Sequence, residues 1–120
     1  MKNNKALRVF ILAALLVAAL SSVALAASKQ LTIANHTGFT IYKIFICPTQ
    51  TNNWGNSLLG SDTLENYETV GLNLNISPQP YDLKVSFVDE SAIEWHEIDL
   101  TKVNAITIKD DGTAEFHQAP

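Results

Sequence analysis

The residues of this sequence best suited to chemistry are one thiol, Cys47, and three imidazoles, those of His36, His96 and His117. A cysteine hydrolase would need Cys47 beside one of these histidines, together with a site for the oxyanion. The spacing between the thiol and the histidines matches no nucleophile motif, and Cys47 closes an apolar stretch of strand type. We therefore predict no catalytic residue and a protein that is not an enzyme.

Metal binding receives equally little support from the sequence. The three histidines lack the short spacings of zinc motifs. Glu94 and His96 share one face of a predicted strand and can touch, but a solvated sheet face is the favoured explanation. Of the acidic turns at residues 89–92 and 110–112, the second, Asp110-Asp111-Gly112, lacks the spaced oxygen ligands of an EF-hand loop. We predict no metal and no cofactor, and we keep a Ca²⁺-binding or structural envelope protein that uses these acidic turns as the alternative function.

A polar stretch at residues 49–60 is the strongest candidate for ligand binding. Trp54 lies near its middle, flanked by the amides of Asn52, Asn53 and Asn56. A flat apolar ring among hydrogen-bonding amides suits stacking on a sugar or anchoring a protein partner. The alternative is that Trp54 folds back and caps the core. We predict a non-enzymatic interaction domain whose Trp54 loop contacts an extracellular glycan or an envelope protein.

The first 26 residues have the three parts of a bacterial export signal. A short positive stretch precedes an apolar run at residues 9–20, and small residues follow, ending in Ala24-Leu25-Ala26. The run is shorter than the roughly 20 residues that span a bilayer, which argues against a permanent anchor. We expect cleavage between Ala26 and Ala27, a secreted or periplasmic protein, and no stable membrane insertion after cleavage.

Charge and cysteine content narrow the partners of the mature domain at residues 27–120. The leader takes three basic residues and no acid, so five lysines face twelve acids and the net charge is −7. Nucleic acid is therefore an unsuitable partner. A single cysteine excludes an internal disulfide. We expect Cys47 to be buried, with a surface thiol or a dimer bridged through Cys47 as the alternatives.

Alternation of apolar and polar residues predicts β-strands along most of the mature chain. The pattern is strict at residues 70–76 and 81–87, which puts one face on a core and the other in water. Leu58, Leu59 and Leu64 are expected to bring the long connection back onto the core, with room for one helical turn. A phase change near Glu97 predicts a β-bulge. Further strands are expected at residues 31–35, 40–47, 93–97, 105–109 and 113–117.

About seven short strands separated by turn residues favour one architecture. We predict a single all-β domain with an antiparallel β-sandwich of immunoglobulin-like type, and a small closed barrel is the main alternative.

The order of these features resembles a family of small secreted bacterial proteins without an established function. The resemblance covers residues 31–108. It rests on residues 35–42, Ile46-Cys47-Pro48, Trp54-Gly55, Leu58-Leu59-Gly60, Leu64, Tyr81-Asp82-Leu83-Lys84-Val85 and residues 95–100. Members often carry Ser in place of Cys47, and an Asp-x-Asp-Gly turn where this chain has Asp89-Glu90-Ser91-Ala92. The resemblance implies the fold and export, and it implies no activity.

Overall fold

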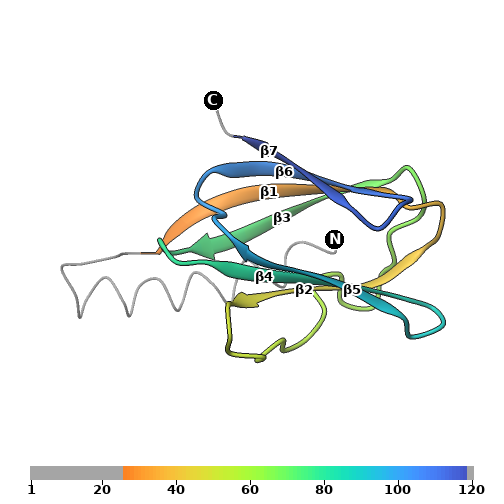
Figure 1. Ribbon diagram of the computed structural model, residues 1–120, viewed down its shortest axis with the longest axis horizontal. Helices are drawn as coiled ribbons and strands as arrows, with labels where there is room; N and C mark the ends of the chain where they lie inside the picture. Colours follow the sequence, from red (N-terminus) through yellow and green to blue (C-terminus); the bar gives the residue numbers. More distant parts are fainter. Residues whose placement is uncertain (1–25, 119–120) are drawn as a thin grey trace.

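The computed structural model describes residues 26–118, which form seven strands and no helix. The strands are β1 (Ala27–His36), β2 (Ile41–Pro48), β3 (Thr69–Ile76), β4 (Tyr81–Phe87), β5 (Ala92–Ile98), β6 (Val103–Lys109) and β7 (Ala114–Gln118). They make a four-stranded sheet, in the order β3-β1-β6-β7, and a three-stranded sheet, in the order β2-β4-β5. The two sheets lie face to face (Figure 1). The predicted seven-stranded sandwich is confirmed, and the closed barrel is not formed.

The predicted export signal lies almost wholly outside the described residues. Ala26 precedes the first strand, and Ala27 is the first residue of β1. Within residues 26–118, no helix has the length and apolar character needed to cross a bilayer.

The core follows from the period-two pattern. Val70, Leu72, Leu74 and Ile76 of β3 are buried, whereas the residues between them are only half-buried. In β4, Tyr81, Leu83 and Val85 are likewise buried, because successive side chains of a strand point to opposite faces; Asp82, on the opposite face, is the exception, since it is buried as well. The buried cluster draws on β1 to β6 and on the β2–β3 connection.

The connectivity matches part of an immunoglobulin domain. Strands β1 to β4 alternate between the sheets, with β1 paired to β3 and β2 paired to β4, and β5 adds to β4. These five strands correspond to B, C, E, F and G of an immunoglobulin domain. The β6–β7 hairpin completes the larger sheet. Its strand β6 runs parallel to β1, with Thr32 opposite Ala105, and among the strand pairs of residues 26–118 this pair alone departs from the expected antiparallel pairing.

The long β2–β3 connection closes one side of the sandwich. The backbone N–H of Leu58 donates to Ile44 O at 2.7 Å, and Leu64 and Ile41 exchange two hydrogen bonds of 2.9 Å. Leu59 and Leu64 are fully buried in the core cluster. The predicted return to the core is confirmed. Two successive turns, in which Gly60 N bonds Ser57 O and Asp62 N bonds Leu59 O, take the place of the single helical turn that the sequence allowed.

The predicted bulge is present at Glu97. This residue has a φ of 58°, and the β4–β5 register shifts between Tyr81 and Leu83. The bulge explains why Ile98 is buried although it is out of phase with Ile93 and Trp95.

Candidate functional site

The two ends of the sandwich differ, and one of them gathers most of the connecting loops. The β1–β2 loop, the segment that leads into β3, the β4–β5 turn and the β6–β7 turn all lie at the right-hand end of Figure 1. We call this end, formed by residues 36–42, 64–69, 87–92 and 109–113, the loop end. In an immunoglobulin variable domain, the loops that correspond to β1–β2 and β4–β5 carry antigen-binding residues.

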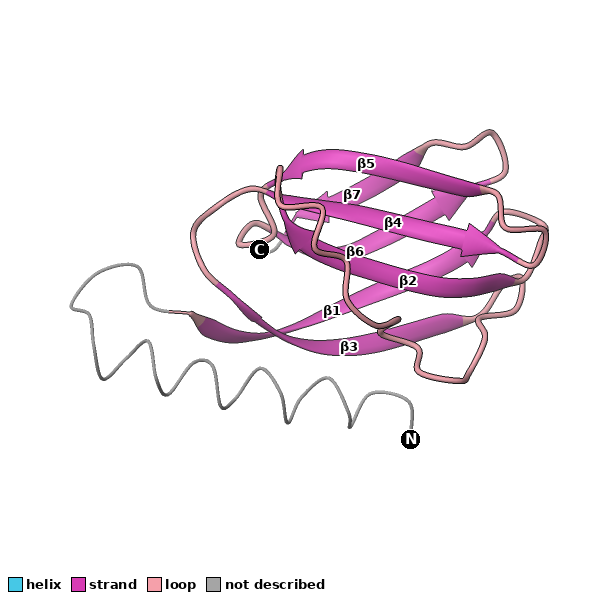
Figure 2. Ribbon diagram, turned by 90° about the horizontal axis from the view of Figure 1, so that it is seen from below, coloured by secondary structure: helices cyan, strands magenta, loops and turns pink. Residues whose placement is uncertain are grey.

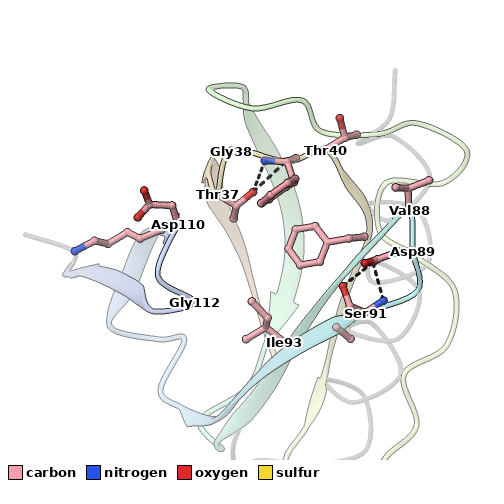
Figure 3. A pocket seen from close by; sticks show the side chains of 13 residues that line it. Thr37, Gly38, Thr40, Val88, Asp89, Ser91, Ile93, Asp110 and Gly112 are labelled. Atoms are coloured by element: carbon pink, nitrogen blue, oxygen red, sulfur yellow. Dashed lines mark hydrogen bonds between the residues drawn. The ribbon is translucent and has the colours of Figure 1, made fainter.

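A groove of about 760 Å³ opens at the loop end between three of these loops. Figure 3 shows Gly38 and Thr40 on one side, Val88 and Asp89 on the second, Asp110 and Gly112 on the third, and Ile93 at the base. Phe39, Phe87 and Ala92 also line it. Its lining is therefore mainly apolar, with charged groups at the rim. We call it the loop-end groove.

Exposed apolar side chains concentrate around this groove. Phe39 is 71% exposed and Val88 is 69% exposed, and both line it. The other large apolar side chains that stand exposed within residues 26–118, Tyr42 and Tyr67, also lie at the loop end. Exposed apolar patches of this kind mark interaction sites more often than chance, because water contact with them is unfavourable.

The three loops around the groove share one local structure. In each, a side-chain oxygen accepts hydrogen bonds from the backbone N–H and the hydroxyl of the residue two positions later, at 2.6 to 3.0 Å. The pairs are Asn35 with Thr37, Asp89 with Ser91, and Asp111 with Thr113. Such Asx turns fix the backbone locally. The loops are consequently held in place before any ligand arrives.

Asn35 is the most heavily used of these turn residues. It is fully buried, and its amide nitrogen donates to Phe39 O at 2.7 Å and to Leu64 O at 2.9 Å. The loop tip is fixed further by the backbone N–H of Gly38, which donates to Asn66 Oδ1 at 2.9 Å. Gly38 has a φ of 88°, which costs glycine little. Phe39 therefore projects from a rigid loop.

The loop end carries a strong negative charge. Six of the twelve acids lie there: Glu65, Glu68, Asp89, Glu90, Asp110 and Asp111. The side-chain hydroxyl of Ser91 lowers the pKa of Asp89, and that of Thr113 lowers the pKa of Asp111, so both carboxylates stay ionised at neutral pH. The one cation that lines the groove, Lys109, is partly neutralised by Glu115, with Nζ and Oε2 3.5 Å apart.

The same turns bear on the calcium alternative. The Oδ1 atoms of Asp89 and Asp111 accept the hydrogen bonds of their own turns. Across residues 26–118, no group of three or more His, Cys, Asp or Glu side chains is placed to hold a metal ion. The calcium alternative stays a prediction.

The predicted Trp54 site lies away from the groove, on the outer face of the β2-β4-β5 sheet. Trp54 is half-buried, and its ring meets Phe45 edge-on, with 6.3 Å between centroids. The ammonium of Lys84 lies 4.8 Å from the centroid of Trp54 and 5.0 Å from that of Phe45. The indole thus covers the outer sheet face and is not part of the core cluster. The three predicted amides beside it, Asn52, Asn53 and Asn56, are exposed, and their role in ligand binding stays a prediction.

Cys47, Asp82 and His96 form a row across three strands on this same outer face. Cys47 pairs with Asp82 in the β2–β4 register, and His96 follows on β5. The thiol is 3% exposed, so its predicted burial is confirmed, and a bridge between chains would require its surroundings to open. Asp82 stands between the thiol and the imidazole. His96 Nδ1 lies 3.0 Å from Asp82 Oδ2, which commits this nitrogen to the carboxylate.

Asp82 is a polar anchor that the sequence does not single out. It is 4% exposed, and its Oδ1 accepts from Thr49 Oγ1 at 2.7 Å and from the bulge N–H of Glu97 at 3.1 Å. Burial raises the pKa of Asp82, but hydrogen bonds from Thr49, His96 and Glu97 outweigh this and hold it below its ordinary value. The hydrogen bond with Asp82 in turn raises the pKa of His96, helped by the charges of Asp82, Glu94 and Glu97. The predicted contact of His96 with Glu94 is present, at 3.4 Å.

Comparison of the chain with family models, with curated proteins and with solved structures finds no significant match. The resemblance to a family of small secreted proteins therefore stays a prediction.

Proposed function

We propose that this chain is a non-enzymatic, exported binding domain that holds an apolar, positively charged segment of a partner protein in the loop-end groove. The observation that carries the proposal is the groove itself, an apolar hollow framed by three separately locked loops. Export rests on the predicted leader and is part of the proposal.

The rigidity of the three loops around the loop-end groove supports a binding function for the loop end. Ordering a flexible loop on association costs free energy, and a loop that is already fixed avoids most of that cost. Asn35, Asp89 and Asp111 supply such fixation at each side of the groove. An exposed aromatic side chain on a fixed loop, such as Phe39, also has the character of a binding hot spot.

The negative charge at the rim of the loop-end groove determines which kind of peptide segment the groove attracts. An acidic rim around an apolar hollow attracts a chain that carries Lys or Arg beside its apolar side chains and repels acidic chains. Phe39 and Val88 would contact the apolar side chains, while Asp89 and Asp110 would face the cations. A peptide of one partner protein meets these demands, and a neutral glycan makes no use of the charge.

The test is selection of binders from a random peptide library displayed on phage, using the domain from Ala27 onward as bait. We expect selected peptides to be enriched in Lys or Arg and in large apolar residues. Phe39→Ala should weaken their binding by about tenfold or more, the loss of a typical hot-spot aromatic. The matched control is Tyr67→Ala, which removes another exposed aromatic at the loop end that does not line the groove. Acidic selected peptides, or equal binding to the Phe39→Ala variant, would refute the proposal.

A further inference from the structure

The four edge strands of the sandwich are not equally protected against pairing with another chain. Edge strands expose unpaired N–H and C=O groups, and proteins usually blunt them with charges, bulges or covering segments. The edge of β2 is hydrogen bonded by residues 58 and 64 of the following connection. The edge of β5 has the bulge at Glu97 and carries Glu94. The edge of β7 is five residues long and carries Glu115.

Within residues 26–118, none of these devices protects the remaining edge strand, β3. Its eight residues, Thr69–Ile76, include no charged residue and no proline, and none has a positive φ. It pairs with β1 on one side and is the outermost strand of its sheet, as Figure 2 shows. Its apolar side chains are buried in the core between the two sheets. Its outer face presents Gly71, Asn73 and Asn75, all half-buried.

We infer that β3 is the contact between two copies of this chain. The two β3 strands run antiparallel about a twofold axis at Asn73, so that Asn73 of one copy lies opposite Asn73 of the other. This register keeps the apolar side chains of both copies on one face and the asparagines on the opposite face, because residues that face each other across a strand pair share a face. The four-stranded sheets then join into one continuous sheet of both copies.

The absence of charged residues on β3 favours a second copy of this chain as the partner that pairs with its edge. Each domain carries a net charge of −7, so two copies repel one another wherever acids meet. The charge-free stretch of β3 is the edge at which the two backbones can approach without placing like charges opposite each other. A side-chain amide both donates and accepts, so Asn73 complements its own image, as a twofold contact requires. A strongly basic partner strand would find no complementary charge on this edge.

The experiment is sedimentation velocity of the domain from Ala27 onward over a wide concentration range, for the wild type and for Asn73→Lys and Asn73→Asp. We expect a monomer–dimer equilibrium for the wild type. In each variant, like charges directly opposite one another should raise the dissociation constant of the dimer by about fivefold. A mixture of the two variants should recover dimerisation, because the new lysine of one copy then meets the new aspartate of the other.

The matched control is Gln118→Lys, which adds a charge to the other edge of the same sheet. This control should dimerise like the wild type. Circular dichroism confirms that each variant is folded, and the recovery in the mixture distinguishes loss of contact from misfolding. A wild type that stays monomeric at every concentration would overturn the inference. So would a dimer that is broken by Gln118→Lys and left intact by both Asn73 variants.

Discussion

Asp82 and His96 are joined across β4 and β5, with 3.0 Å between Oδ2 and Nδ1. The same carboxylate holds Thr49, the first residue after β2, and the N–H of Glu97 at the bulge. One buried acid therefore ties together all three strands of the smaller sheet. Removing any one of these partners should weaken the contacts that Asp82 makes with the other two.

This contact makes folding stability depend on pH in a definite direction. The pKa of His96 is raised above its ordinary value of 6.5, so its contribution is complete below that pH and fades as pH rises through the raised pKa. The pKa of Asp82 is lowered below 3.8, so its contribution is complete above that pH and fades as pH falls through the lowered pKa. The contact should stabilise the fold most between about pH 3.8 and pH 6.5.

Thermal unfolding followed by circular dichroism across this range checks the expectation. His96→Gln should remove the loss of stability on the alkaline side. His117→Gln is the control, because His117 lies on the other sheet and its ring contacts the Thr107 hydroxyl. If the two variants have the same pH profile, His96 is not the group responsible.

A second prediction concerns the amide of Asn35. Asn35→Asp preserves the shape and the acceptor oxygen but removes both hydrogen bonds to Phe39 O and Leu64 O, and it places a carboxylate against two carbonyls. The free energy of unfolding should fall by about 2 kcal/mol or more, the cost of buried groups left without partners. Chemical denaturation measures it.

The control for Asn35 uses the same substitution where the amide acts as an acceptor. Asn66 Oδ1 accepts from the N–H of Gly38, and an aspartate can keep that bond. Asn66→Asp should therefore change stability little. Equal losses in the two variants would show that the added charge, and not the lost donors, is responsible.

A third prediction tests how the side of the sandwich is closed. Leu59→Ala should destabilise the protein by about 2–5 kcal/mol, since it leaves a cavity in the core. Leu58→Ala, at a half-buried position of the same connection, should lower the free energy of unfolding clearly less. Comparable losses at the two positions would contradict the packing of Leu59 between the sheets.

A fourth prediction addresses Trp54. Because the Lys84 ammonium lies over the ring of Trp54, a double-mutant cycle between Trp54→Ala and Lys84→Met should give a coupling free energy of about 0.5–1 kcal/mol. Equilibrium denaturation of the four proteins measures the coupling, and a value of zero would show that the two side chains do not interact. The glycan prediction is separate. A glycan screen that finds a ligand whose affinity is unchanged by Trp54→Ala would place the ligand elsewhere.

The strands can be predicted where the alternation is strict and local. The pattern alone predicts residues 81–87, which are β4, and its prediction at 70–76 misses β3 by one residue. It predicts the first strand at 31–35, but β1 begins at Ala27. Residues 27–30 lack an apolar alternation and are extended because they pair with β3, which the local sequence does not reveal.

The loop-end groove cannot be predicted from the sequence, because it is assembled from loops that are distant along the chain. Phe39 and Val88 are ordinary apolar residues next to turns, and no local pattern distinguishes an exposed one from a buried one. Trp54 stands out by the composition around it, yet its position depends on Lys84 of another strand. The Asx-x-Ser/Thr spacing is a local signal of rigid turns, but it does not single out the groove, because Asp99 and Thr101 form the same turn in the β5–β6 connection.

Binding of an apolar, basic segment in the loop-end groove can be observed residue by residue. The most direct measurement is a titration of isotope-labelled domain with a synthetic peptide of alternating lysine and leucine, followed by amide chemical shifts in NMR spectra. We expect shifts confined to residues 37–40, 87–93 and 109–112, which are lost in Phe39→Ala and much smaller with a glutamate–leucine peptide. Shifts centred on residues 49–57, shifts spread over the whole surface, or no shifts at all would contradict it.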